Sequence, residues 1–188
     1  MQKKTKDNLL FAVVFSVCLI LVIMIGMRLS SDGGTEPPIN GNNHPPQTGI
    51  HVHNDSTTIS HKVLLDLDIG IVLWSSNNII ENCTFINCTD EGIYITQNSH
   101  NNTFINCVFY KCLDGVELQK SCNNMFNHCW FLSNTHAGVD AIRDNNNNNT
   151  FFSCVFYDNL MGAYFSQSQN NTFPDTLFVD NGEDKIGC

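Results

Sequence analysis

Apolar and polar residues repeat along most of this chain with a period of about 23 residues. In each repeat a glycine precedes two apolar residues that alternate with other residues, and such period-2 alternation is typical of a short strand with one buried face. The glycines are spaced by 22, 23, 23 and 24 residues. They are Gly70, Gly92, Gly115, Gly138 and Gly162. A column of nearly constant spacing indicates a structural repeat.

A second column has the same period and marks polar corners. Its members are Asn78, Asn102, Asn124, Asn149 and Asn171. Every repeat has a phenylalanine seven residues after this asparagine, and four of the five repeats have a cysteine five residues after it. These residues are Phe85, Phe109, Phe131, Phe156 and Phe178, with Cys83, Cys107, Cys129 and Cys154. Stacked phenylalanines would fill an interior, with cysteine as a small apolar neighbour.

Two columns with one period predict stacked coils. One repeat cannot bury its own apolar face, whereas several repeats stacked in parallel can. The asparagine-rich corners and the β-branched and aromatic strands disfavour helices. The sequence therefore predicts an all-β fold over residues 51–188, a parallel β-helix (solenoid) of about five coils. We expect it to be right-handed, because parallel crossovers almost always are.

The cysteine column predicts buried free thiols. Counterparts in neighbouring coils lie ~4.8 Å apart, slightly more than the Cβ separation of ~3.5–4.5 Å in a disulfide. Disulfides and a thiolate metal site are the alternatives, and a second pair, Cys88 and Cys112, falls near the next corner. The asparagine column has a structural explanation, because asparagine tolerates left-handed corners and can hydrogen-bond to its stacked copy.

The N-terminal quarter has a different pattern. Residues 1–8 contain three lysines and form a predicted cytoplasmic tail, and residues 9–27 are apolar and uncharged. Nineteen helical residues at ~1.5 Å each span roughly 28 Å, about the bilayer core. We expect an uncleaved transmembrane helix, with a cleaved signal peptide as the alternative. Lysines beside a membrane span usually stay in the cytoplasm, so we expect the solenoid on the opposite, extracytoplasmic side. Residues 28–50 are rich in Pro, Gly and Asn and are predicted to form a flexible linker.

The charge of the chain argues against one class of function, nucleic-acid binding. The 188 residues include 18 acidic and 9 basic side chains, a net charge of −9. A nucleic-acid-binding surface is therefore not expected.

The repeats resemble the right-handed parallel β-helix superfamily, which has the pectate-lyase-like fold. Within it they are most similar to the short-coil repeats of NosD-like and carbohydrate-binding proteins. The matching stretches are Ile93-Tyr-Ile, Val116-Glu-Leu with Ser121, and Val72-Leu-Trp with Ser76. The resemblance covers about residues 60–182 and implies the fold rather than an activity, since members include lyases, hydrolases, epimerases and non-catalytic binders. The catalytic motifs of the enzymatic relatives are absent from the sequence.

The candidate binding face follows from the outward positions of the predicted strands. The column two residues after the glycine consists of Val72, Tyr94, Glu117, Asp140 and Tyr164, and Trp74, Asp90, Asp114 and Arg143 lie beside it. The resemblance implies saccharide binding along this sheet, where aromatic rings stack on sugars and carboxylates bind hydroxyls or Ca²⁺. Glu117 and Asp140 would lie about 5 Å apart, in the range of a retaining glycosidase pair. The alternative is that exposed acids only keep the protein soluble.

Three further features are candidate sites. His51 and His53 form an H-x-H pair that could chelate a metal, and NosD-like proteins are linked to copper, but the spacing fixes no third ligand. His128 and His136 are expected to be isolated surface or corner residues. Asn148, in an N-x-T sequon on an enlarged loop, is the most accessible candidate for glycosylation.

The sequence thus predicts a membrane-anchored, extracytoplasmic β-helix module that contacts polysaccharide or glycan without catalysis. A first alternative is a polysaccharide lyase or hydrolase centred on Glu117, Asp140 and Arg143. A second is a structural envelope protein whose partners bind the side of the solenoid. No organic cofactor is expected, and Ca²⁺ could take part.

Overall fold

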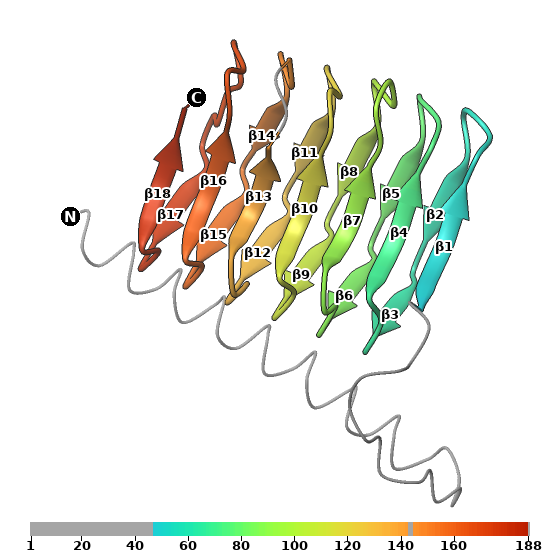
Figure 1. The fold of residues 1–188 in the computed structure, drawn as a ribbon, viewed down its shortest axis with the longest axis horizontal. Coiled ribbons are helices and arrows are strands. Elements are labelled where there is room, and N and C mark those ends of the chain that lie inside the picture. The colour runs from blue at the N-terminus through green and yellow to red at the C-terminus, as the bar shows by residue number, and fades with distance from the viewer. Residues whose placement is uncertain (1–46, 143–144, 188) are drawn as a thin grey trace, which may run out of the picture. The chain divides into compact units, whose positions relative to one another are not determined.

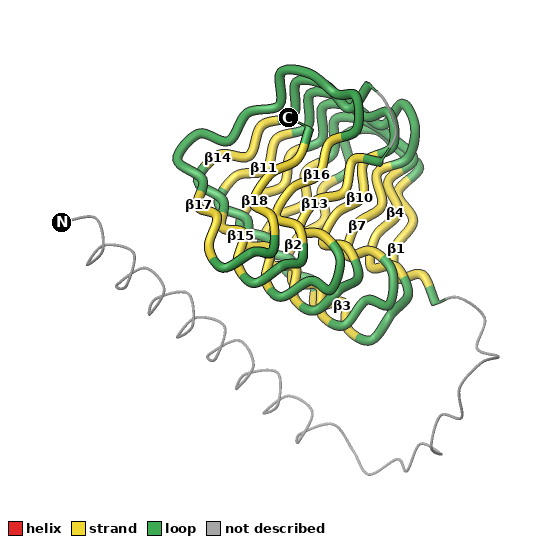
Figure 2. The backbone as a smooth tube through the Cα atoms, turned by 60° about the vertical axis from the view of Figure 1, so that its left-hand side comes forward, coloured by secondary structure: helices red, strands yellow, loops and turns green. Residues whose placement is uncertain are grey.

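The computed structural model describes residues 47–142 and 145–187, which form a β-solenoid of about six turns. Each complete turn contributes one strand to each of three parallel sheets, here called sheets A, B and C (Figures 1 and 2). The expected all-β fold is confirmed, with one turn more than predicted. The first strand, β1, begins at Thr48, three residues before the predicted start of the solenoid at residue 51.

The strands of each sheet follow one another in chain order. Sheet A consists of β1 (Thr48–Val52), β4 (Ile69–Leu73), β7 (Glu91–Ile95), β10 (Asp114–Leu118), β13 (Ala137–Ala141), β16 (Met161–Phe165) and β18 (Glu183–Ile186). Sheet B consists of β2 (Thr58–Ser60), β5 (Ile79–Glu81), β8 (Thr103–Ile105), β11 (Met125–Asn127) and β14 (Thr150–Phe152). Sheet C consists of β3 (Val63–Leu65), β6 (Thr84–Ile86), β9 (Val108–Tyr110), β12 (Trp130–Leu132), β15 (Val155–Tyr157) and β17 (Leu177–Val179).

All strand pairs are parallel, and their register places repeat counterparts side by side. In sheet A, for example, Glu117 pairs with Tyr94 on one side and with Asp140 on the other. The predicted columns are therefore real spatial neighbours.

Phenylalanine stacks fill the interior. The predicted column from Phe85 to Phe178 is confirmed, with successive ring centroids 4.4 to 4.9 Å apart. A second stack runs from Phe104 to Phe173 at 4.4 to 5.0 Å. Each stacked pair adds about 0.5–1.5 kcal/mol beyond the burial of the rings. At the C-terminal end of the core, the Lys185 ammonium lies 5.2 Å from the ring centroid of Phe173, so a cation covers the last rings.

The glycine column is required by close packing rather than by an unusual backbone angle. A Cβ on Gly115 would lie 2.5 Å from the carbonyl oxygen of Gly138 and 2.9 Å from the ring of Phe131. Real Cβ atoms do not approach a backbone oxygen this closely, so any larger residue would separate the coils.

The Asn-Asn corners divide two tasks between neighbouring residues. Asn123 adopts the left-handed conformation, with φ of 58°, and its side chain is exposed. Asn124 is buried, and its Oδ1 accepts hydrogen bonds from the backbone N of Asn102 at 2.9 Å and from its Nδ2 at 3.2 Å. The asparagine ladder from Asn78 to Asn171 is built from such links. The left-handed position and the stacked position, which we expected in one residue, are thus separate.

A second ladder occupies the corner after sheet C. Asn134 donates to Asn159 Oδ1 at 2.9 Å, and Asn159 donates to Asn181 Oδ1 at 2.9 Å. This column begins with Cys88 and Cys112, so the second cysteine pair lies at a corner as predicted.

The seven cysteines among the described residues are free, which confirms the preference for thiols over disulfides. Burial raises the pKa of Cys129 well above its usual value. Buried, protonated thiols of this kind are poor nucleophiles and act as apolar packing.

The predicted tail, transmembrane helix and most of the linker lie outside the described residues. Within residues 47–142 and 145–187 there is no helix that is long and apolar enough to span a bilayer.

Replacing Asn124 with Ala should lower the free energy of unfolding by about 2–4 kcal/mol, because two buried donors of Asn102 lose their acceptor. Urea denaturation followed by circular dichroism measures the change. The control is Asn123→Gly, which keeps the left-handed corner and should change the free energy by less than about 1 kcal/mol. Equal losses in both variants would contradict the division of tasks at the corner.

Candidate functional site

The outer face of sheet A gathers the polar side chains that the repeat does not require for packing. In each five-residue strand the glycine and the residue after it face the core, so the first and fourth residues face outward. The outward pairs are Glu91 and Tyr94 on β7, Asp114 and Glu117 on β10, Ala137 and Asp140 on β13, and Met161 and Tyr164 on β16. Four carboxyl groups from three adjacent strands thus lie near one another.

An acid–histidine cluster forms where β10 meets β13. His136, the residue before β13, places Nδ1 2.8 Å from Asp114 Oδ1 and 3.7 Å from Asp140 Oδ2. The backbone N of Ala137 also donates to Asp114 Oδ1, at 2.9 Å. The side chains of Asp114 and Asp140 are only 7% and 5% exposed, whereas that of His136 is 37% exposed. The two acids are therefore buried beside each other, and the partly exposed imidazole lies between them and solvent.

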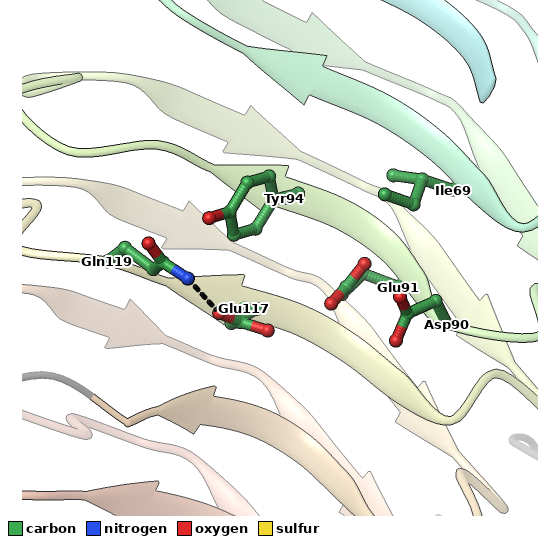
Figure 3. A pocket seen from close by; sticks show the side chains of 6 residues that line it. All are labelled: Ile69, Asp90, Glu91, Tyr94, Glu117 and Gln119. Carbon is green, nitrogen blue, oxygen red and sulfur yellow. Dashed lines mark hydrogen bonds between the residues drawn. The ribbon is translucent and has the colours of Figure 1, made fainter. Parts of the chain in front are cut away.

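Beside this cluster is an open hollow of about 240 Å³ (Figure 3). Its lining consists of Ile69, Asp90, Glu91, Tyr94, Glu117 and Gln119. The side-chain amide of Gln119 donates to Glu117 Oε1 at 2.7 Å, which fixes the orientation of that carboxylate. The hollow combines carboxyl, amide and phenol groups, all of which can bind hydroxyls.

The carboxyl groups cannot all be ionised at neutral pH. Burial raises the pKa of Glu91 from 4.5 to about 9, and the hydrogen bond with Glu117 and the charge of Asp90 add to the shift. Burial, followed by the charge of Asp114, raises the pKa of Asp140 to about 7. Burial also raises the pKa of Asp114, although His136 opposes this shift. Glu91 is therefore a protonated hydrogen-bond donor at pH 7.

Two of these groups have an oxygen whose hydrogen-bonding capacity is not used. Glu91 Oε2 and Asp140 Oδ1 are buried and have no hydrogen-bond partner in the described part of the chain. A buried carboxyl oxygen without a partner costs about 1–3 kcal/mol. Where the acids meet, the outer face of sheet A therefore contains buried carboxyl oxygens that could still accept a hydrogen bond or bind a ligand.

Most predicted site residues lie on this one face. Tyr94, Glu117, Asp140 and Tyr164 are successive neighbours in register, and Asp114 belongs to the acid–histidine cluster. Arg143 lies outside the described residues.

A separate aromatic row lies at the ends of the first two strands of sheet A, β1 and β4. Trp74 is 55% exposed, and its ring lies 6.2 Å from that of His53, which in turn stacks on His51 at 6.0 Å. No third metal-binding side chain joins His51 and His53 in a cluster among the described residues. The exposed Asn148 occupies a left-handed corner, with φ of 56°, and its glycosylation stays a prediction.

Two residues of the site were not predicted. The expectation that His136 is isolated is wrong, because the corner before β13 turns its ring toward Asp114. Glu91 was not predicted, although Asp114, its counterpart before the glycine of the next repeat, was assigned to the face. The position before the glycine, which holds Glu91 and Asp114, would have identified it.

Comparison with protein families matches residues 39–151 to the right handed beta helix region. The chain belongs to this family. The match covers more than half of the chain and agrees with the three parallel sheets of the structure.

Among solved structures, the chain is similar to the periplasmic alginate epimerase AlgG, with 18% identity and a TM-score of 0.47 over 74% of this chain and 36% of that one. It also matches QnrB1, a plasmid-mediated fluoroquinolone resistance protein, with 14% identity and a TM-score of 0.22 over 68% of this chain and 72% of that one. This β-helix chain thus spans about a third of the epimerase. No curated protein sequence matches it significantly.

The raised pKa of Glu91 predicts a stability that falls as pH rises. Between pH 4.5 and about 9 the folded state keeps a proton on Glu91 that the unfolded state releases, so unfolding becomes easier as the pH increases. Urea unfolding midpoints should be higher at pH 5 than at pH 8.5, and Glu91→Gln should reduce this difference. Asp180→Asn, at an exposed corner, is the control and should leave the difference unchanged. A Glu91→Gln variant with the pH dependence of the wild type would refute the assignment.

Proposed function

We propose that this chain is a glycan-binding β-helix module, and that a polysaccharide runs along the outer face of sheet A. The observation that carries the proposal is the hollow of about 240 Å³ on that face, in which Glu91, Glu117 and Gln119 offer hydroxyl-binding groups beside Tyr94.

The outward columns of sheet A indicate the direction in which a bound polysaccharide would run. Tyr94 and Tyr164 belong to the same outward column, three coils apart, which is about 14 Å at the spacing of parallel strands. Both side chains are half-buried, so their rings are held by their neighbours and present a fixed surface. Trp74 extends the aromatic surface toward β1. A linear saccharide can therefore stack on rings at several points and bind carboxyl groups between them.

The charge of the face selects among polysaccharides. The strands β1, β4, β7, β10, β13 and β16 contain no lysine or arginine, and their outward acids are Glu91, Asp114, Glu117 and Asp140. A polyuronate would be repelled wherever these acids are ionised, whereas a neutral or amine-bearing glycan would not. We therefore propose a neutral or amine-bearing ligand.

A second candidate function is glycoside hydrolysis. Glu91 and Glu117 line the same hollow, and burial raises the pKa of Glu91 to about 9. A carboxyl group that stays protonated at neutral pH can serve as the general acid that this chemistry requires, beside a second carboxyl group. Binding is the preferred proposal because no catalytic motif of the enzymatic relatives occurs in the sequence.

The module is proposed to act outside the cell membrane. The support comes from the sequence: three lysines precede the uncharged apolar residues 9–27, and a linker follows.

Binding is tested with the full-length chain in mild detergent on immobilised neutral, amine-bearing and uronic-acid polysaccharides. Tyr94→Ala combined with Tyr164→Ala should weaken binding to the preferred glycan roughly tenfold or more, because two stacking rings are lost. Tyr110→Ala combined with Tyr157→Ala, on sheet C, is the matched control and should leave binding unchanged. Unchanged binding in the variant with both Tyr94→Ala and Tyr164→Ala would contradict the proposal. Turnover that disappears in Glu117→Gln while binding persists would instead establish the hydrolase.

The anchor is tested by membrane fractionation. The chain should stay with membranes after an alkaline wash, and Leu21→Arg combined with Ile23→Arg should release it, since each arginine costs about 2.5–3.5 kcal/mol at a helix centre. A matched Leu21→Ala, Ile23→Ala variant should remain bound. A mature protein that begins after residue 27 would show that the segment is a cleaved signal peptide.

A further inference from the structure

The acid–histidine cluster beside the hollow has the composition of a metal site. Asp114, His136 and Asp140 each offer a ligand atom, and these atoms lie within 4.8 Å of one another. It is the only such group of three or more metal-binding side chains in the described ranges 47–142 and 145–187. The three residues come from β10, from the corner before β13 and from β13 itself.

The separations fit one small cation between the three ligands. Zn–N and Zn–O bonds of about 2.0–2.2 Å at a tetrahedral angle place neighbouring ligand atoms roughly 3.4 Å apart. His136 Nδ1 lies 2.8 Å from Asp114 Oδ1 and 3.7 Å from Asp140 Oδ2, values that bracket this separation. The third separation, between the Asp114 and Asp140 oxygens, is at most 4.8 Å, so side-chain adjustments could bring all three ligand atoms around one ion.

An unused buried oxygen points independently to a ligand. Asp140 is only 3% exposed, its Oδ1 has no hydrogen-bond partner in the described part of the chain, and its Oδ2 faces His136. A simple histidine–aspartate pair would satisfy Asp114 and leave this oxygen unsatisfied beside a second acid. A divalent cation would balance both carboxylates and give Asp140 a partner.

We propose that Asp114 Oδ1, His136 Nδ1 and Asp140 bind a divalent transition-metal ion of the Zn²⁺ type. The imidazole ligand favours a transition metal. Ca²⁺ and Mg²⁺ prefer oxygen ligands, whereas a mixed set of nitrogen and oxygen ligands suits Zn²⁺ and the other first-row metals.

The site has a rigid base and an open side. Asp114 Oδ1 also accepts from the backbone N of Ala137, and the backbone N of His136 donates to the carbonyl of Leu113 at 2.9 Å, so the ligands are fixed by the sheet. The half-exposed His136 side chain marks the side from which the ion enters. Three protein ligands leave one tetrahedral position to be filled from outside the chain, as in catalytic rather than structural zinc sites.

The test uses the full-length chain in mild detergent, freed of metal by chelation, titrated with Zn²⁺ and with Co²⁺ in a calorimeter and a spectrophotometer. One equivalent should bind, Co²⁺ should give the visible absorption of a tetrahedral site, and Zn²⁺ should raise the unfolding temperature. His136→Gln and Asp140→Asn should each weaken binding by at least 10-fold, since losing even a ligand's supporting partner costs 10–100-fold.

Controls separate this site from other metal-binding groups. His51→Gln combined with His53→Gln should leave the affinity unchanged, and an absence of sulfur-to-cobalt charge-transfer bands should exclude the cysteines. Circular dichroism of each variant checks that the solenoid is intact. The proposal is overturned if no stoichiometric binding occurs, if binding persists in His136→Gln, or if equimolar Ca²⁺ displaces Zn²⁺.

Discussion

In-register stacking of parallel strands is the constraint on which the rest of this structure depends. Because each coil places its residues beside their own counterparts, a favourable contact made once is repeated at every coil. The stacked phenylalanines and the asparagine ladders are such repeated contacts. The same register allows only glycine at Gly115 and its counterparts, because the carbonyl of the next coil occupies the space that a side chain would need. Core and corners are thus over-determined, and only outward positions vary freely.

This difference between the constrained core and the less constrained outward positions explains how much of the fold the sequence could predict. Phe109 and Asn124 recur at fixed offsets, so their neighbours in space could be inferred from the period alone. The tasks of Asn123 and Asn124 could not be separated, because the sequence shows two asparagines and only the backbone shows which one is left-handed. The start of the first coil was placed a few residues too late, because this coil lacks the asparagine and phenylalanine columns, although Gly49 occupies the glycine position.

The candidate site was predictable only where it follows the repeat. Glu117 and Asp140 share a column, so their contact could be anticipated. His136 lies on a corner, and its contact with Asp114 depends on a local turn that no periodicity encodes. The protonation of Glu91 was also beyond sequence reasoning, because it depends on how deeply the neighbouring coils bury an outward side chain.

The uniform interior has a consequence for how such a protein can change. Because successive coils present the same residue types to one another, removing or duplicating a complete coil would still join phenylalanine to phenylalanine and asparagine to asparagine. The outer face would not be conserved in this way. Without the coil that contains β10, for example, Tyr94 would become the neighbour of Asp140. Recombination in whole-coil steps can therefore rearrange the surface chemistry of this solenoid while its packing stays intact.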